Sequence, residues 1–160
     1  MKELVGIAGQ IAAKLVARKQ TIAVAESSTG GLISAALLSV PGASAYFLGG
    51  AVVYTRAARG LLMDIPDEAM KGIRSASEPY AKLLAQTARR RFATDWGLSE
   101  TGATGPTGNR YGDAAGHSCM AVAGAQTSVI TLETGKSDRQ ANMHEFAKTA
   151  LELLLKNLSQ

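Results

Sequence analysis

The sequence predicts an α/β domain in which helices are layered on a mixed β-sheet. Segments with strand character alternate with segments of helical periodicity along the 160 residues, an order typical of layered α/β proteins. The apolar run 21–25 is typical of a strand buried on both faces. Only residues 124–126 separate two later strands, and so short a connection favours an antiparallel hairpin. A chain of 160 residues fits a single domain, 1–160.

The first part of the chain is predicted to run helix, strand, helix. Residues 2–19 carry apolar side chains at helical spacing and should form an amphipathic helix. The strand over 21–25 follows it. A helix is then expected over 29–39 and should end before Pro41, because proline disfavours the helical conformation in the residue that precedes it.

The next strand carries a glycine pair. Residues 46–55 are apolar and rich in β-forming residues, and Gly49 and Gly50 inside this stretch suggest a bulge or the close approach of another segment. Residues 56–63 are expected to form a short helix. A further helix should begin near 65–68, where acidic residues suit the positive end of a helix dipole.

The remaining elements complete the predicted order α-β-α-β-α-α-β-β-β-α. Apolar residues over 81–92 mark one face of a longer helix, and 96–100 should be a short strand that leads into a glycine-rich loop. The hairpin strands are 117–123 and 127–132. Apolar side chains over 147–158 predict the closing helix.

The composition is that of an ordinary folded protein. Apolar residues make up 46% and charged residues 19% of the chain, which is too apolar for a disordered segment. The net charge is +4, the densest basic cluster is 89–91, and aromatic residues are only 5%. A nucleic-acid surface needs a basic stripe and often stacking aromatic rings. We therefore interpret 89–91 as a solvated helix face and expect a small anionic ligand rather than nucleic acid.

The single cysteine, Cys119, excludes an internal disulfide. It lies in the apolar run 119–123, so we expect a buried and inert thiol, which fits a reducing, cytoplasmic location. No apolar stretch approaches the roughly 20 residues that span a bilayer. Residues 1–5 also lack the apolar region of a signal peptide, so no membrane partner is expected.

Two segments combine glycines with hydroxyl side chains where the chain is expected to reverse direction. The first contains Ser27, Ser28, Thr29, Gly30 and Gly31, and the second contains Thr101, Gly102, Thr104 and Gly105. Glycine lets a backbone approach a ligand closely, and Ser and Thr supply donors and acceptors. Both segments follow strands, and ligands of open α/β sheets bind beyond the carboxyl ends of the strands. The two segments should therefore border one site for a polar, phosphorylated small molecule.

The helix that follows Ser27 would present free N–H groups at its start, which makes an anion site. Alternatively, Ser28 or Thr29 simply caps this helix. Glu26 would oppose a phosphate at this place. We therefore expect its carboxylate to accept hydrogen bonds from backbone N–H groups or to pair with a neighbouring cation.

Several common sites are absent from the sequence. The glycine segments lack the Gly-Lys-Ser/Thr ending of a Walker A loop, and neither G-x-G-x-x-G nor G-x-S-x-G occurs. His117 and His144 have no partners at metal-ligand spacing, so we expect them to be structural or solvated and expect no metal site.

The chain resembles the family of CinA C-terminal domains, the nicotinamide mononucleotide deamidases. Residues 25–31, A-E-S-S-T-G-G, are similar to the family's A-E-S-C-T-G-G. Residues 41–44 resemble its P-G-S-S, and 101–106 its T-G-I-A-G-P. Tyr54 matches the tyrosine that ends the second strand, and 138–139 match the G-D-R before the last helix.

This resemblance implies a three-layer α/β/α sandwich with a mixed, five-stranded sheet, assembled as a homodimer. It implies hydrolysis of nicotinamide mononucleotide to nicotinate mononucleotide and ammonia, without a metal or organic cofactor. By position, Ser44 is the implied nucleophile and Arg139 a phosphate ligand, while Ser27, Tyr54 and Thr101 fall where family site residues lie. The other implied substrate-binding positions are Ser28, Thr29, Gly30, Gly31, Gly102 and Gly105.

The chain departs from the family where the pattern Y-x-N-x-x-K is expected. Arg56 holds the asparagine position and Arg59 the lysine position. A serine nucleophile needs a base to take its proton, and a desolvated lysine can be that base. Arginine stays protonated and cannot, so Arg59 remains a site residue only as a clamp for an anion. Segment 109–113 also differs from the family and is expected to reshape the substrate mouth.

Three functions therefore stay open. One is an amidohydrolase that uses another base, such as Tyr54 or a water held by Glu26. The second is a catalytically impaired relative that binds a nucleotide or a partner protein. The third is a different reaction on a phosphorylated metabolite.

Overall fold

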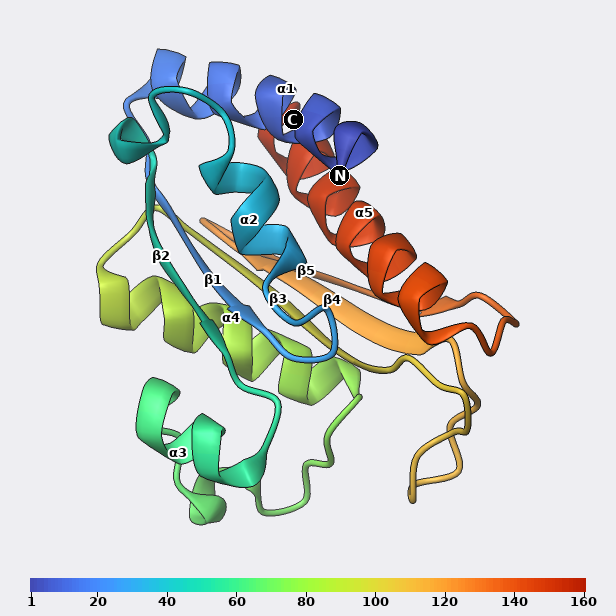
Figure 1. Ribbon diagram of the computed structural model, residues 1–160. Helices are drawn as coiled ribbons and strands as arrows, with labels where there is room; N and C mark the ends of the chain where they lie inside the picture. The colour runs from blue at the N-terminus through green and yellow to red at the C-terminus, as the bar shows by residue number, and fades with distance from the viewer.

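A computed structural model describes all residues, 1–160. It confirms an α/β fold with a mixed five-stranded sheet in the order β2-β1-β3-β4-β5 (Figure 1). The strands are β1 (Ile22–Glu26), β2 (Phe47–Val52), β3 (Trp96–Ala103), β4 (His117–Ala123) and β5 (Thr127–Glu133). The α-helices are α1 (Lys2–Arg18), α2 (Leu32–Leu38), α3 (Arg56–Met63), α4 (Glu78–Phe92) and α5 (Arg139–Leu158), and the 3-10 helices are η1 (Ala43–Ala45) and η2 (Asp67–Met70).

The sheet is parallel on one side and antiparallel on the other. Strand β1 pairs in parallel with both β2 and β3, whereas β4 is antiparallel to β3 and to β5. The predicted β4–β5 hairpin is thus confirmed. Strands β2 and β5 are the two edges of the sheet. The carboxyl ends of β1, β2 and β3 therefore meet at one end of the molecule.

Helices cover both faces of the sheet and complete the three layers. Helices α1, α2 and α5 pack on one another over one face, and α4 packs against β1, β3 and β4 on the other (Figure 1). Strand β1 alternates between the two layers: Ile22 and Val24 join the larger core under α1, α2 and α5, and Ala23 and Ala25 join the core beside α4. Every residue of β1 is buried, as its apolar sequence predicts.

Gly49 and Gly50 of β2 lie where other segments approach the strand closely, as their sequence suggests. A Cβ on Gly49 would lie 2.7 Å from the ring of Phe92 in α4, and one on Gly50 would lie 2.3 Å from Ser34 Oγ in α2. The register with β1 also shifts between Ile22 and Ala23. These positions therefore lack side chains because helices press on both faces of the edge strand.

Two boundaries near the glycine segments differ from the prediction. Helix α2 begins at Leu32 rather than at residue 29, because residues 27–31 form a turn. Strand β3 continues to Ala103, so Thr101 and Gly102 lie in the sheet, paired with β4, rather than in a loop. The predicted helix near 65–68 is the short 3-10 helix η2.

The expected buried thiol is confirmed, since Cys119 is buried beneath α4 among alanines of α4 and β4. Burial raises the pKa of this thiol. None of the helices combines the length and the apolar character that crossing a bilayer requires.

Candidate functional site

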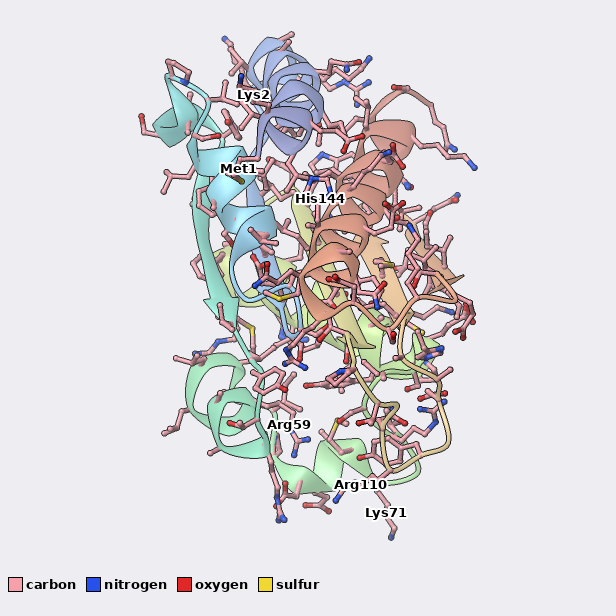
Figure 2. All side chains as sticks on the ribbon, turned by 45° about the vertical axis from the view of Figure 1, so that its right-hand side comes forward. Met1, Lys2, Arg59, Lys71, Arg110 and His144 are labelled. Atoms are coloured by element: carbon pink, nitrogen blue, oxygen red, sulfur yellow. The ribbon has the colours of Figure 1, made fainter.

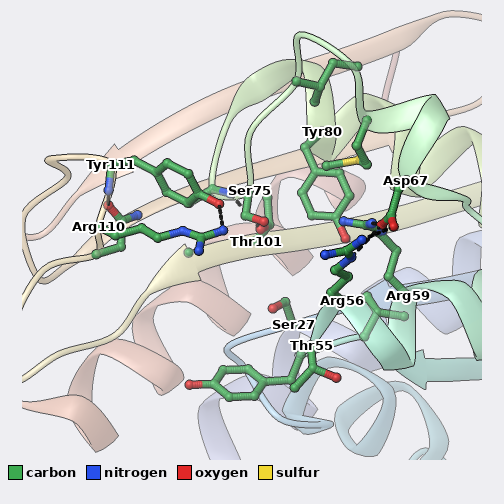
Figure 3. A pocket seen from close by; sticks show the side chains of 17 residues that line it. Ser27, Thr55, Arg56, Arg59, Asp67, Ser75, Tyr80, Thr101, Arg110 and Tyr111 are labelled. Carbon is green, nitrogen blue, oxygen red and sulfur yellow. Dashed lines mark hydrogen bonds and ion pairs between the residues drawn. The ribbon is translucent and has the colours of Figure 1, made fainter.

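A cleft of about 560 Å³ opens at the carboxyl ends of β1, β2 and β3. Its polar lining comes from six separate segments: Ser27, Tyr54, Thr55, Arg56, Arg59, Asp67, Ser75, Tyr80, Thr101, Asn109, Arg110 and Tyr111. In Figure 3, Arg56, Arg59 and Asp67 form one side of this cleft and Arg110 and Tyr111 the other, with Ser27 and Thr101 between them. Figure 2 shows Arg59 and Arg110 at the end of the molecule away from Met1.

The structure thus brings together five of the site positions that the sequence singled out. Ser27, Thr101 and Gly102 come from the two glycine segments, and Tyr54 follows β2. Arg59 borders the same cavity, from α3. Segment 109–113 also contributes to the mouth of the cleft, as expected, because Arg110 and Tyr111 line it. The Arg110 guanidinium donates a hydrogen bond to the Tyr111 hydroxyl at 2.9 Å.

The first glycine segment is not an open anion cradle, because two buried glutamates take its donors. Glu100 Oε2 accepts from the backbone N–H groups of Ser27 at 3.1 Å and Thr29 at 3.0 Å. Glu100 Oε1 accepts from the hydroxyl groups of Ser28 at 2.5 Å and Ser118 at 3.1 Å. Burial raises the pKa of the Glu100 carboxyl, and these hydrogen bonds oppose that rise.

Glu26 fills the N-terminus of α2. Its carboxylate accepts from the N–H groups of Gly31 at 2.8 Å, Ile33 at 3.2 Å and Ser34 at 2.9 Å. The expectation that Glu26 accepts from backbone N–H groups is confirmed. The expectation of an anion site at this helix start is wrong, because a carboxylate of the chain already occupies it.

Thr29, Gly30 and Gly31, which the resemblance implies as substrate-binding residues, shape this turn. The Thr29 hydroxyl lies 2.8 Å from Glu26 and 3.0 Å from Glu100, and both Thr29 and Ser28 are buried. Gly30 and Gly31 have φ of 64° and 103°, the left-handed region that glycine tolerates best. Only Ser27 of this turn lines the main cleft, and Ser28 lines a smaller cavity beside it.

That smaller cavity, of about 210 Å³, lies under the second glycine segment. It adjoins the main cleft, since Tyr54, Gly102 and Asn109 line both. Gly105 and Arg139 also line it, and the Arg139 guanidinium donates to the carbonyl of Gly105 at 2.6 Å and to the Tyr54 hydroxyl at 3.1 Å.

The walls of the smaller cavity offer an unpaired hydroxyl and an unopposed cation. The buried hydroxyl of Thr104 has no hydrogen-bond partner. The lining contains Arg139 and no carboxylate. This cavity therefore suits a compact anion.

Arg56 and Arg59 share one carboxylate. Asp67 Oδ1 accepts from Arg56 Nε at 2.8 Å and from Arg59 Nη2 at 2.7 Å, and Asp67 Oδ2 accepts from Arg56 Nη2. The hydrogen bond with Arg56 lowers the pKa of the Asp67 carboxyl. Asp67 is thus held as an anion between two guanidinium groups, which makes it a poor general base.

The back wall of the cleft is held by groups that the sequence did not reveal. Nε2 of the buried His117 lies 2.7 Å from the carbonyl of Ala76, and Nδ1 is hydrogen-bonded to Glu133. Arg74 forms an ion pair of 2.5 Å with Asp113, which fixes the loop that carries Tyr111. No sequence motif marks these contacts, because each joins residues that are far apart in the chain.

The structure does not bring Ser44 into the site. Ser44 lies exposed in η1, just before β2, whereas the cleft lies beyond the carboxyl end of that strand. The six residues of β2 span about 20 Å. Within one chain, Ser44 is therefore too remote to act on a ligand in the cleft. No cluster of three or more His, Cys, Asp or Glu side chains is placed to hold a metal ion.

Comparisons with known proteins agree on one family. A family model described as the CinA C-terminal domain matches residues 5–158. A CinA-like protein of Gloeobacter violaceus is 35% identical over 154 residues, which cover 95% of this chain and 36% of that protein. A CinA-like protein of Anaeromyxobacter sp. strain K is 36% identical over 144 residues, 90% of this chain and 35% of that protein. The chain thus spans about a third of the length of these curated relatives.

Solved structures show the same fold. A competence/damage inducible protein of Agrobacterium tumefaciens superposes with a TM-score of 0.90 at 26% identity, covering 99% of this chain and 96% of that one. A competence-damaged (CinA) superfamily protein of Klebsiella pneumoniae superposes with a TM-score of 0.91 at 22% identity, covering 98% of each chain.

Proposed function

Because this chain belongs to the family of the CinA C-terminal domain, we propose that its cleft binds nicotinamide mononucleotide or a close relative and hydrolyses the amide. The products are nicotinate mononucleotide and ammonia. The observation that carries the proposal is the convergence of Ser27, Tyr54 and Thr101, from three separate strand ends, on one cleft that arginines surround. A cytoplasmic location is part of the proposal.

The two adjoining cavities divide the ligand between them. The phosphate occupies the smaller cavity, where Arg139 and the unpaired hydroxyl of Thr104 lie and no carboxylate repels it. The pyridine ring extends past Tyr54 into the main cleft, whose walls include the rings of Tyr80 and Tyr111. The amide then points toward the Arg59 side.

Amide hydrolysis through a serine has two steps. The serine oxygen attacks the carbonyl carbon, the carbon–nitrogen bond breaks, and ammonia leaves with the proton of the hydroxyl. Water then cleaves the ester and releases the carboxylic acid. Ser44 takes the nucleophile's role only if it comes from a second copy of the chain, because it lies outside the cleft of its own chain.

The free edge of β2 suits such a second copy, in keeping with the homodimer that the resemblance implies. Leu48 is 47% exposed and Val52 is 40% exposed on this strand, and no strand of the chain pairs with its outer edge. Antiparallel pairing of two β2 strands, centred on Gly49 and Gly50, brings the segment before β2 of one copy, which holds Ser44, near the segment after β2 of the other, which holds Thr55. Thr55 lines the cleft, so this arrangement completes the site.

A second candidate function is nucleotide binding without turnover. The Arg59–Asp67 pair favours it, because neither side chain offers a base: arginine stays protonated, and Asp67 is held as an anion by two guanidinium groups. An active enzyme must take the proton through Tyr54 or through a water molecule.

Ammonia release separates the two functions. We expect purified protein at high concentration to release ammonia from nicotinamide mononucleotide, and Ser44→Ala to abolish the release. Ser39→Ala is the matched control, since Ser39 lies at the end of α2 and outside both cavities. Binding of the nucleotide by calorimetry with no ammonia above the blank supports the second candidate. The absence of both binding and ammonia contradicts both functions.

A further inference from the structure

We propose that Arg56, Arg59 and Asp67 form a carboxylate-binding subsite, so that the cleft prefers a nucleotide whose ring bears a carboxylate over one whose ring bears an amide. This inference rests on the proposed function, because it places the same class of nucleotide in the same cleft. It adds the chemical class of the favoured occupant. It also identifies Arg59 as the residue that determines this specificity.

The subsite carries an excess of positive charge. One carboxylate, Asp67, accepts hydrogen bonds from two guanidinium groups. It neutralises one of the two charges, and no other acidic side chain lines the main cleft. Arg110 on the opposite wall adds a further cation. An anionic group that enters between these walls therefore meets attraction from both sides.

Arg59 is the buried cation of this cluster. Its side chain is only 9% exposed, whereas that of Arg56 is 77% exposed. Arg59 uses Nη2 for Asp67, and its buried Nε has no hydrogen-bond partner. A cation that is so little exposed gains most from a negative charge brought close to it, because water competes little for that charge.

The surroundings of Arg59 strengthen that interaction. Figure 3 shows Tyr80 beside Arg59, and Met70 and Ile73 add apolar side chains to the lining of the same cleft. An ion pair in a recess with apolar walls is less screened than one on an open surface. The phosphate of the nucleotide has its own place near Arg139, so the cluster is left for a second anionic group.

A ring carboxylate meets these requirements and a ring amide does not. A carboxylate has two acceptor oxygens that match the two parallel N–H groups of a guanidinium. An amide offers one oxygen, and its NH2 group faces the arginines as a donor against donors. The cluster therefore selects the acid over the amide, whether the acid is a product that the enzyme retains or the ligand that a binding protein senses.

Calorimetric titration of the full chain with nicotinate mononucleotide and with nicotinamide mononucleotide tests this preference. We expect the acid to bind at least about tenfold more tightly, the effect of one charge-assisted hydrogen bond. Chromatography after each titration checks that the amide is unchanged. If the chain hydrolyses it, the titrations are repeated in Ser44→Ala.

Two variants should change the affinity for the acid in opposite directions, which loss of structure could not do. Arg59→Met should lower the affinity for the acid about tenfold and change the affinity for the amide by less than about threefold. The preference for the acid should therefore disappear. Asp67→Asn removes the competing carboxylate and should strengthen binding of the acid. Arg139→Met, at the smaller cavity, is the control and should weaken both nucleotides by the same factor.

Equal affinity of the two nucleotides for the unmodified chain would overturn the inference while leaving the proposed function intact. An equal loss of affinity for both nucleotides in Arg59→Met would also overturn the inference. The group bound at Arg56, Arg59 and Asp67 would then be the phosphate, which both nucleotides share. If neither nucleotide binds, the proposed function itself fails.

Discussion

At the scale of single residues, two buried glutamates organise the site. Glu26 accepts hydrogen bonds from the backbone N–H groups at the start of α2. Glu100 accepts hydrogen bonds from the turn that precedes α2. The two carboxylates are bridged by the Thr29 hydroxyl. The turn that carries Ser27 into the cleft is thus held from inside the protein, and it needs no ligand to order it.

Replacing Glu100 with alanine should destabilise the protein and loosen this turn. The change removes the acceptor of the Thr29 N–H group and of the Ser28 hydroxyl, both buried, whereas the Ser27 N–H and the Ser118 hydroxyl keep the carbonyl oxygens of residues 100 and 101. The loss costs about 3 kcal/mol of unfolding free energy. Urea unfolding measures the loss. Glu68→Ala, an exposed residue of η2, is the control and should change the stability by less than about 0.5 kcal/mol. A similar stability of both variants would contradict this role of Glu100.

His117 should make stability depend on pH. Burial lowers the pKa of His117, but hydrogen bonds to Glu133 and to the carbonyl of Ala76, with the charge of Asp113, outweigh burial and raise it. Both ring nitrogens face acceptors, so the fold favours the protonated ring. Its stabilising contribution is full below the unfolded-state pKa of about 6.5 and is lost as pH rises through the higher pKa of the folded state.

The comparison with His117→Gln checks this prediction by urea unfolding at about pH 6 and about pH 8.5. We expect the variant to be less stable at the lower pH by about 1 kcal/mol or more, with a smaller difference at the higher pH. His144→Gln, at a half-buried histidine near Glu3, is the control and should keep the pH dependence of the unmodified protein. A His117→Gln deficit that grows with pH would show that the ring stabilises the fold in its neutral form.

At the scale of elements, the helices and strands were largely predictable because burial repeats along them. The apolar spacing of α1, α4 and α5 and the continuous apolar run of β1 report which faces are buried. The boundaries around the site were not predictable in this way. Strand β3 extends to Ala103 because β4 pairs with its last residues, and that partner is 14 or more residues away in the chain.

The glycines of the strands give an element-scale prediction. A Cβ on Gly97 of β3 would lie 2.0 Å from the carbonyl oxygen of Ala85 in α4, so Gly97→Ala must push the helix off the sheet. We expect a loss of about 2 kcal/mol in unfolding free energy. Gly6→Ala is the matched control, because nothing lies within 4 Å of the added Cβ in α1. This control should gain about 0.5 kcal/mol from helix propensity. A stable Gly97→Ala variant would contradict the close packing of α4 on β3.

The site was predictable from sequence only in part, for a physical reason. Ser27, Tyr54 and Thr101 follow or end strands, and topology carries the ends of parallel strands to one edge. The acceptor of Arg59, Asp67, lies on η2 and is marked by no motif. Ser44 was placed by family position alone, and the strand that follows it carries the chain away toward the cleft.

At the scale of the whole molecule, the proposed dimer depends on the edge strand β2. Leu48→Lys adds a charge to the apolar edge and should convert a dimer to a monomer in sedimentation analysis. If Ser44 acts across the interface, the same variant should also lose ammonia release. Thr131→Lys, at an exposed position of the opposite edge strand β5, should leave both unchanged. A monomeric unmodified protein that releases ammonia would contradict this assembly.

The most direct test of the whole account is a crystal structure of the protein with nicotinate mononucleotide. We expect the phosphate within hydrogen-bond distance of Arg139, the ring between Ser27 and Thr101, and the carboxylate facing Arg59. An empty cleft at saturating nucleotide would contradict it, as would a nucleotide bound only in the basic hollow at Arg89 and Arg90 at the far end of α4.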